Sequence, residues 1–173
     1  MKKENYINHE GGIKKDYNRH NLLKEESLKC ALYYHLRRKS DKILRENSLR
    51  TYIEFYIKEM KYRAAIAIVR IDEECDATYL VDWVEEIVAI FELKCESGFS
   101  QGTMNVIKKD ISKMKQYVKS FDCLCYFATL YESECDWYNW MDKRATNSWA
   151  KGKVTELNTG YNNGKMVFEV NSY

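Results

Sequence analysis

The chain has 173 residues, a length that suits one compact domain. Charged residues make up 31% of it and hydrophobic residues 45%, which are the proportions of a globular protein and disfavour a disordered or collagen-like chain. No apolar run approaches the roughly eighteen residues of a membrane-spanning helix, and the polar residues 1–20 lack the apolar region of a secretory signal. We therefore expect a cytoplasmic protein without a membrane partner.

The formal net charge of +2 is unevenly distributed along the chain. Residues 64–103 are acidic, whereas residues 1–63 and 104–121 are basic. This alternation suits a site where carboxylates hold a cation while nearby lysines and arginines bind a polyanion. An ordinary solvated surface is the alternative interpretation.

The N-terminal part of the sequence predicts an arm followed by helical structure. Residues 1–20 form the expected basic arm. From Asn21, which is a reasonable N-cap, apolar residues recur at helical spacing and predict an amphipathic helix. A second short helical piece is expected from Ser40.

The periodicity then changes from helical to strand-like. Residues 51–57 alternate between apolar and polar, and residues 63–71 form a β-branched run that suits a strand buried on both faces. Residues 85–94 predict a third strand. Residues 100–119 return to helical spacing, and residues 123–131 predict a fourth strand.

Residues 132–173 are expected to extend the same domain. A short helix is predicted around residues 137–144, and two strands flank Asn163-Gly164, a strong hairpin signal. The order of helix, three strands, helix and strand over residues 21–131 requires a mixed sheet with helices packed against it. The sequence therefore predicts an α/β architecture.

The third predicted strand ends in the tripeptide Glu92-Leu93-Lys94. Because strand side chains alternate, Glu92 and Lys94 should lie on one face and Leu93 on the other. A carboxylate two residues from an ammonium at a buried strand end is unfavourable unless something else binds there. A frayed, solvated strand end is the alternative.

These features resemble the PD-(D/E)XK nuclease superfamily, which has the restriction-endonuclease-like αβββαβ fold. That family carries an acidic-x-Lys pair on its third strand, a metal-binding Asp at the start of the second, and often a Glu on the first helix. Residues 92–94 match the pair, and Glu25 matches the helix Glu, with Glu26 as the less favoured choice. The resemblance covers residues 21–131.

The resemblance implies a metal-dependent endonuclease in a restriction or phage-defence setting. Glu92 and Glu25 would hold Mg²⁺, for which Mn²⁺ can substitute, and Lys94 would orient the attacking water or help to deprotonate it. The implied substrate is nucleic acid, expected to be double-stranded DNA. A compact nuclease of this kind cuts both strands most easily as a symmetric homodimer.

The sequence departs from the family at the metal-binding Asp. The matching position is occupied by Ala65. Three explanations are open: a replacement introduced into the sequence, natural degeneration of a nuclease, or a ligand that has moved to Asp72 at the far end of the same strand. Natural degeneration would make the chain a non-catalytic module that binds nucleic acid or protein.

Two sets of polar side chains are expected to contact the phosphates of a bound nucleic acid. The helix after the motif carries Lys109, Lys113 and Gln116, together with Asp110. The first helix carries Arg37 and Arg38. Lysine and arginine supply most of the salt-dependent affinity in such complexes.

Overall fold

The computed structural model describes residues 12–98, 101–134, 140–141 and 148–173. Three helices, six strands and one short 3₁₀ helix are found in this part of the chain. In chain order they are α1 (Ile13–Asn18), α2 (Glu25–Glu46), β1 (Leu49–Ile57), β2 (Tyr62–Ile71), η2 (Leu80–Trp83), β3 (Val84–Glu96), α3 (Gln101–Phe121), β4 (Leu124–Glu134), β5 (Val154–Asn162) and β6 (Lys165–Ser172).

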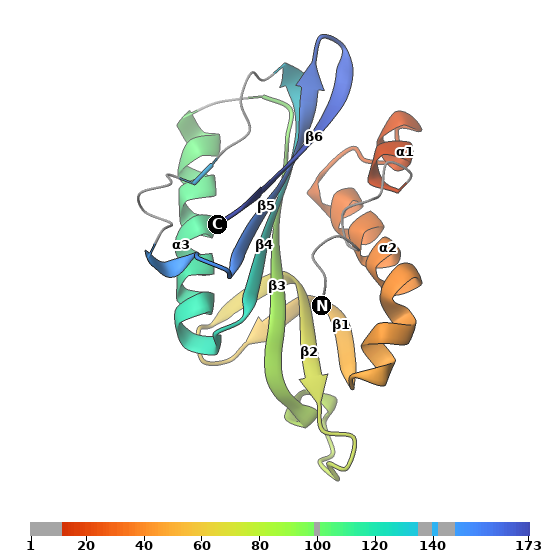
Figure 1. Cartoon of the computed structure of the whole chain (residues 1–173), viewed down its shortest axis with the longest axis vertical. Helices are drawn as coiled ribbons and strands as arrows, with labels where there is room; N and C mark the ends of the chain where they lie inside the picture. The colour runs from red at the N-terminus through yellow and green to blue at the C-terminus, as the bar shows by residue number, and fades with distance from the viewer. Residues whose placement is uncertain (1–11, 99–100, 135–139, 142–147) are drawn as a thin grey trace.

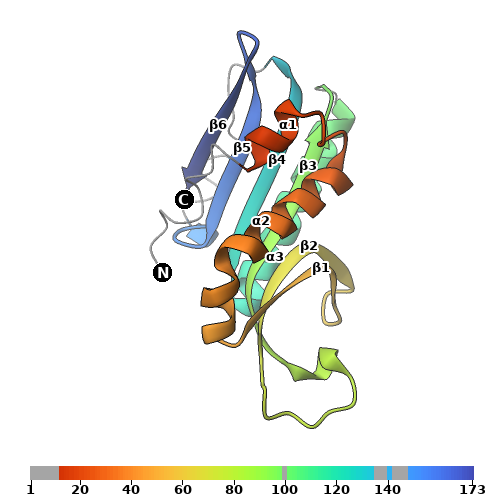
Figure 2. The same ribbon diagram turned by 90° about the vertical axis from the view of Figure 1, so that its right-hand side faces the viewer.

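The six strands form one mixed sheet in the order of the chain, from β1 to β6. Strands β1, β2 and β3 are antiparallel, β3, β4 and β5 are parallel, and β6 returns antiparallel to β5. Helix α3 covers one face of the sheet, and α1 and α2 cover the other (Figure 1; Figure 2). The predicted α/β class and mixed sheet flanked by helices are therefore confirmed.

Apolar side chains fill the space between the sheet and each helical layer. The α3-side core includes Met114 and Tyr117 of α3 against Ile90 and Phe127 of the sheet. The α2-side core packs α2 against the opposite face of β2 and β3, and its members include Leu36, Leu44, Ile66, Phe91 and Leu93. Ile90 and Leu93 thus lie on opposite faces, as strand alternation predicts.

Helix α2 is one continuous helix of 22 residues. Its N-cap is Lys24, so the prediction of Asn21 as the cap is wrong. The separate helical piece expected from Ser40 is the second half of this helix. An ion pair one turn apart, from Arg45 to Asp41, supports this part of the helix.

The predicted N-terminal arm is wrong for residues 13–18, which form α1. Ile13 and Tyr17, one turn apart, pack against the small cluster of Leu22, Leu28 and Leu130. A hydrogen bond of 2.8 Å joins Asp16 Oδ2 to Nε2 of His35 on α2. These contacts hold a helix that is too short to be stable alone.

The alternation of faces in β1 and β2 changes near Glu54 and Ala65. Glu54 has a φ of 50°, which interrupts the regular extended backbone. Ala64 belongs to the α3-side core and Ile66 to the α2-side core. In a regular strand, residues two positions apart would face the same side. Ala65 packs against the α2-side core, whereas Ala67 and Val69 lie in the α3-side core. Regular strand alternation predicts that residues 65, 67 and 69 share one face, and this prediction is therefore wrong.

The C-terminal hairpin is confirmed. Strands β5 and β6 pair up to Asn162 and Lys165. Asn163 and Gly164 between them have φ values of 49° and 70°, the left-handed conformation that a two-residue hairpin turn of type I′ requires. The short helix predicted around residues 137–144 falls outside the described residues, apart from Trp140 and Met141.

No helix among the described residues is long and apolar enough to cross a membrane.

Candidate functional site

The end of β3 meets the beginning of α2 at a partly buried ion pair. Lys94 Nζ donates a hydrogen bond of 3.0 Å to Oε2 of Glu25, the first residue of α2. The two residues are 69 positions apart in the sequence. The helix glutamate and the strand lysine that the resemblance assigns to one site therefore lie in contact.

Helix α3 contributes two further charged residues at the same place. Asp110 Oδ2 lies 3.2 Å from Lys94 Nζ, and Asp110 Oδ1 accepts a hydrogen bond of 2.7 Å from Lys113 Nζ. Lys113 Nζ also lies 3.9 Å from Oε2 of Glu92. We call Glu25, Glu92, Lys94, Asp110 and Lys113 the charged cluster.

Glu92 is the most deeply placed carboxylate of β3, with 4% of its surface exposed. The hydroxyl of Tyr117 donates a hydrogen bond of 2.9 Å to its Oε1. Burial raises the pKa of Glu92 from 4.5 to about 7, although Lys113, Tyr117 and Lys94 each favour the ionised form. Desolvation of the carboxylate therefore outweighs the neighbouring positive charges.

Both lysines of the charged cluster are ammonium ions at neutral pH. Burial lowers the pKa of Lys94, but Asp110 and Glu25 outweigh this effect and the net pKa is raised. The pKa of Lys113 is raised in the same way, against burial, by Glu92 and Asp110. The cluster thus holds three carboxyl groups and two ammonium groups, and it is close to electrically balanced when Glu92 is protonated.

The raised pKa of Glu92 leads to a stability prediction. A carboxyl whose pKa is higher in the folded state than in the unfolded state stabilises the fold below pH 4.5, and this contribution is lost as the pH rises through 7. We expect Glu92→Gln to match the original chain at pH 4 and to be more stable at pH 8, by up to about 3 kcal/mol. Urea unfolding at both pH values measures the difference.

Glu86→Gln is the matched control for this test, because Glu86 is an exposed glutamate on the same strand. Its effect on the free energy of unfolding should change little with pH. A Glu92→Gln difference that is the same at pH 4 and pH 8 would contradict the raised pKa.

Ala65 lies beside Glu92 in the register of the sheet. The last pair of the β2–β3 ladder on this side is Ile66 with Phe91, so the next positions along the two strands are 65 and 92. Ala65 is half-buried, whereas the neighbouring Ala64 has no exposed surface. A side chain at 65 can therefore reach solvent, but it starts from the α2-side face, whereas Glu92 contacts Tyr117 of the α3-side core.

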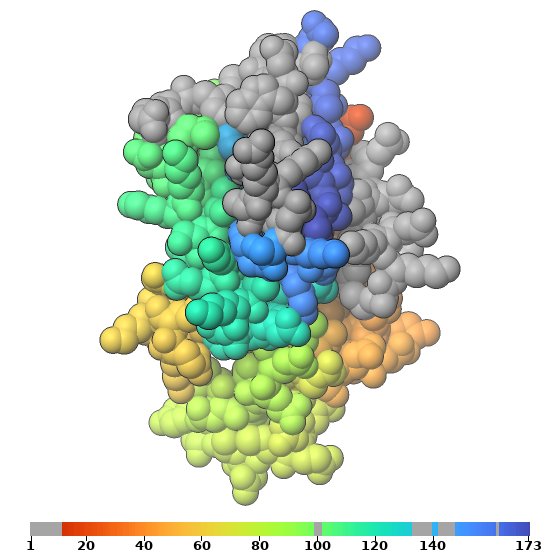
Figure 3. All heavy atoms as spheres, turned by 60° about the vertical axis from the view of Figure 1, so that its left-hand side comes forward, coloured from red at the N-terminus to blue at the C-terminus, as the bar shows by residue number. Residues whose placement is uncertain are grey.

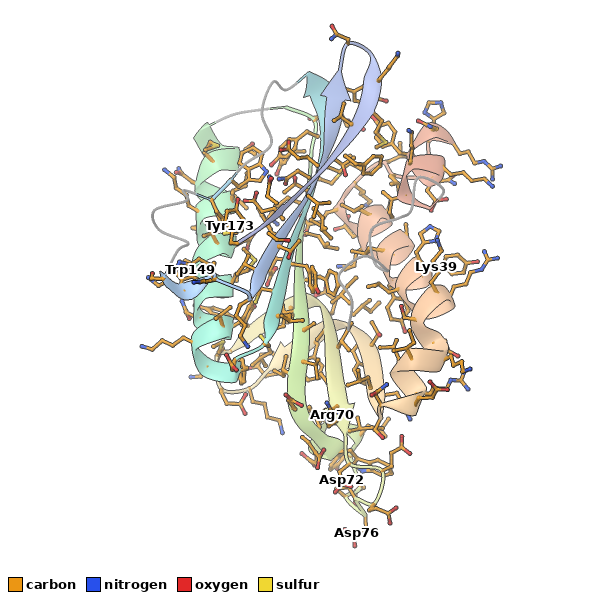
Figure 4. All side chains as sticks on the ribbon, viewed as in Figure 1. Lys39, Arg70, Asp72, Asp76, Trp149 and Tyr173 are labelled. Atoms are coloured by element: carbon orange, nitrogen blue, oxygen red, sulfur yellow. The ribbon has the colours of Figure 1, made fainter. Side chains whose placement is uncertain are left out.

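Asp72 does not replace the missing carboxylate. It follows Ile71, which pairs with Val84 at the opposite end of β3 from Glu92. Asp72 and Asp76 both lie on the hairpin that projects from the far end of the molecule (Figure 4). Of the three explanations for Ala65, the moved ligand at Asp72 is thus excluded by distance.

The carboxylates of the charged cluster are the oxygen ligands that Mg²⁺ prefers. Asp110 Oδ2 is buried and makes no hydrogen bond, although the Lys94 ammonium lies near it. Within the described residues, however, no three acidic, histidine or cysteine side chains are grouped closely enough to hold a metal ion. The oxygen donors suit a hard cation, but the carboxylates of the charged cluster are not grouped as a cation site in the described part of the chain.

The residues predicted to bind nucleic acid lie in two different layers. Lys109 and Gln116 are exposed on α3, whereas Lys113 is engaged in the charged cluster. Arg37 and Arg38 are exposed on α2, on the other side of the sheet, where each lies over a tyrosine ring of the preceding turn. The five residues therefore do not form one surface.

The exposed face of α3 is uniformly basic. Its exposed charged side chains are Lys108, Lys109, Lys115 and Lys119, and the single acidic residue of the helix, Asp110, is buried. In the space-filling view of Figure 3, α3 is coloured green and lies along the left side of the molecule. This surface is on the opposite side of α3 from Tyr117, which contacts Glu92.

Sequence reasoning did not identify Tyr117 as a partner of Glu92. The buried stripe of α3 includes Ile107, Asp110, Met114 and Tyr117, a spacing of three, four and three residues. Two polar residues on an otherwise apolar stripe are a signal of buried polar contacts. The apolar residues alone predict a buried stripe through positions 104, 107, 111, 114 and 118. Positions 111 and 118 of this stripe are one residue after the buried Asp110 and Tyr117.

Comparisons of the chain with protein-family models, with curated proteins and with solved structures found no match.

Proposed function

We propose that the charged cluster belongs to a centre for metal-dependent phosphodiester hydrolysis of nucleic acid. The observation that carries the proposal is the contact of Lys94 with Glu25 beside the buried Glu92. Burial disfavours the ionised form of Glu92 and raises its pKa, which is a feature of functional carboxylates. The resemblance of Glu92 and Lys94 to the acidic-x-Lys pair of PD-(D/E)XK nucleases supports the same assignment.

Glu92 would be one ligand of the cation. Glu25 would be a second ligand or would position Lys94. A bound Mg²⁺ or Mn²⁺ supplies charge stabilisation at the phosphate and lowers the pKa of a water molecule. Because Lys94 is protonated at neutral pH, its role is to stabilise the negative charge that develops on the phosphate. Proton abstraction by Lys94 is disfavoured for the same reason.

A second candidate function is a binding module without catalytic activity. Lys113 Nζ lies between Asp110 and Glu92, where its positive charge already offsets the two carboxylates. Together with Ala65, this arrangement favours a cluster that holds α3 against the sheet rather than a metal ion. The basic face of α3 would then serve a nucleic acid partner.

Cleavage assays separate the two functions. The chain and its Ala65→Asp variant are incubated with plasmid, linear duplex, single-stranded DNA and RNA, with Mg²⁺ or Mn²⁺ and with chelator. Metal-dependent cleavage that chelator abolishes supports the hydrolytic function. Binding of nucleic acid by both proteins without cleavage of any substrate would favour the module. Double-stranded DNA as the substrate, a homodimer and a cytoplasmic location stay predictions.

The basic face of α3 leads to a prediction about binding. We expect the chain to bind a duplex with an affinity that falls steeply with salt, because lysines release counterions from the phosphates. Replacing Lys108, Lys109, Lys115 and Lys119 with glutamine should reduce the salt slope by up to about 0.9 for each lysine that neutralises a phosphate. Fluorescence anisotropy over a salt series measures both quantities.

The control for this test is the double variant Arg37→Gln and Arg38→Gln on the opposite layer. It removes two exposed positive charges without touching α3, so it should leave most of the salt slope in place. A larger reduction from the α2 pair than from the four α3 lysines would place the nucleic acid on the other face of the sheet.

A further inference from the structure

Two cysteines lie in sulfur contact where helix α3 leads into strand β4. Cys123 comes two residues after the end of α3, and Cys125 is the second residue of β4. Their Sγ atoms are 4.0 Å apart. This place is the lower end of α3 in Figure 1, where the chain passes into β4. The pair shares no residue with the charged cluster.

The backbone allows the two sulfurs to close to a disulfide. The Cα atoms of residues two positions apart are separated by at most about 7 Å, and the Cα atoms of disulfides by about 4.4–6.8 Å. The sulfur contact of 4.0 Å shows that both side chains already turn toward each other. Closing to a bond of about 2.05 Å needs a movement of about 2 Å.

The sheet restrains Cys125 more than Cys123. The parallel ladder of β3 with β4 begins at Leu124, which pairs with Ala89, so Cys123 lies just outside it. Cys125 is inside the ladder, and its amide donates a hydrogen bond of 2.8 Å to the carbonyl of Lys153. The movement that a bond requires therefore falls on Cys123 and on the connection from α3.

The surroundings make the two thiols unequal. The hydrogen bond with Cys125 and the ammonium of Lys153 lower the pKa of the Cys123 thiol, although burial acts in the opposite direction. The hydrogen bond with Cys123 and burial raise the pKa of Cys125. An ion pair of 2.8 Å with Asp122 holds Lys153 at this place. A favoured thiolate beside a protonated thiol is typical of an attacking cysteine and its resolving partner.

Burial restricts the oxidant to a small molecule. Cys123 is 3% exposed, and Cys125 has no exposed surface. The side chain of Asp122 is 86% exposed, so Cys123 is one residue away from a solvated position. Hydrogen peroxide suits such a site, whereas thiol–disulfide exchange requires a much larger reagent to bring its sulfur against the thiolate.

We propose that Cys123 and Cys125 are an oxidisable pair, which hydrogen peroxide converts to a disulfide. The Cys123 thiolate attacks a peroxide oxygen, the S–O bond forms as the O–O bond breaks, and the hydroxide that leaves takes up a proton. Cys125 then attacks the sulfur of this sulfenic acid. The S–S bond forms, the S–O bond breaks, and the hydroxyl group leaves as water with the proton of Cys125. Two thiols and one peroxide thus give one disulfide and two waters.

The test is peroxide treatment of the reduced full chain, followed by alkylation of the remaining thiols in urea and mass spectrometry. Cleavage after Asp122 and Glu132 releases residues 123–132, a peptide that holds both cysteines, no third cysteine and no methionine. After oxidation this peptide should carry no alkyl group and should be two hydrogen atoms lighter than the reduced peptide. Dithiothreitol should restore two thiols that can be alkylated.

Three variants separate the roles of the residues. Cys125→Ser should form no disulfide and should leave a sulfenic acid at Cys123, which dimedone traps when the chain is then unfolded in urea. Cys123→Ser should give neither product. Lys153→Gln should slow disulfide formation about threefold, because it removes the positive charge that favours the thiolate.

Cys30→Ser is the matched control, because it removes an exposed cysteine of α2. It should form the disulfide within residues 123–132 at the rate of the original chain. Urea unfolding confirms that each variant is folded, and the mass measurement on the original chain depends on no variant.

Two results would overturn the proposal. A peptide 123–132 that keeps both alkyl groups after peroxide treatment of the folded chain, and loses them only after treatment in urea, would mean that the fold protects two inert core thiols. A dimedone adduct at Cys125 in Cys123→Ser, without one at Cys123 in Cys125→Ser, would contradict Cys123 as the attacking cysteine.

Discussion

Replacing Ala65 with aspartate is expected to create metal-dependent cleavage, at least about 100-fold above the rate of the chain itself. Position 65 is next to Glu92 in the register of β2 and β3 and is half-buried, so a carboxylate there can stay hydrated until a cation binds. Because Ala65 faces the α2-side core, this carboxylate must reach around the strand end to share the cation with Glu92. A hard cation that keeps several waters depends strongly on its one or two protein carboxylates. Initial rates on plasmid with Mg²⁺ or Mn²⁺ give the comparison.

Two further changes in the Ala65→Asp background test whether the new activity uses the proposed residues. Glu92→Ala removes a cation ligand and Lys94→Ala removes the ammonium beside the phosphate, so each should return the rate to that of the chain itself. Activity that survives Glu92→Ala would contradict the assignment of Glu92 as a ligand.

Ala64→Asp is the positional control. Ala64 lies in the α3-side core with no exposed surface, where an unpaired carboxylate is strongly unfavourable. We expect this variant to lose stability and to cleave nothing. Cleavage by Ala64→Asp together with an inactive Ala65→Asp would move the missing ligand by one residue, to the position that shares a core with Tyr117.

Glu156→Leu is expected to destabilise the fold by about 4 kcal/mol. Glu156 on β5 has no exposed surface, and burial raises its pKa against the effect of its hydrogen bonds. Its carboxylate accepts hydrogen bonds from Trp140 N at 3.0 Å, Asn158 Nδ2 at 3.2 Å, Asn171 Nδ2 at 3.4 Å and Tyr173 OH at 2.9 Å. Leucine would remove the fully buried acceptor of these four hydrogen bonds.

Glu85→Leu is the matched control for Glu156→Leu, because Glu85 is exposed on a strand of the same sheet. Urea unfolding should show a change near zero for Glu85→Leu and a much smaller destabilisation for Glu156→Gln, which keeps one acceptor oxygen. Equal effects of the two leucine variants would mean that the four hydrogen bonds contribute little to stability.

The fold could be predicted to the level of elements and their order. Strand alternation and β-branched composition located β2 and β3 within two residues at each end, and Asn163-Gly164 located the final hairpin. The short α1 could not be predicted because its few residues carry little periodicity, and its stability comes from Asp16 and His35 and from packing on α2. Tertiary contacts of this kind leave no local pattern.

The candidate site could be predicted only in part. The proximity of Glu25 to Lys94 was expected from the family resemblance, which assigns the helix glutamate and the strand lysine to one site. The face of Ala65 could not be derived from strand period, because the φ of 50° at Glu54 depends on the pairing of β1 with β2. The prediction that Lys113 binds phosphate did not anticipate that its ammonium is held by Asp110.

Calorimetric titration of Ala65→Asp with Mn²⁺ at pH 6.5, in two buffers of different ionisation enthalpy, tests the role of Glu92 most directly. Because the pKa of Glu92 is raised to about 7, its carboxyl is largely protonated at this pH and must lose its proton to become a ligand. We expect one Mn²⁺ per chain, the release of a proton on binding, and the loss of both in Ala65→Asp with Glu92→Gln. Binding of Mn²⁺ with the same affinity and without proton release in the Glu92→Gln background would contradict a metal-dependent centre at this site.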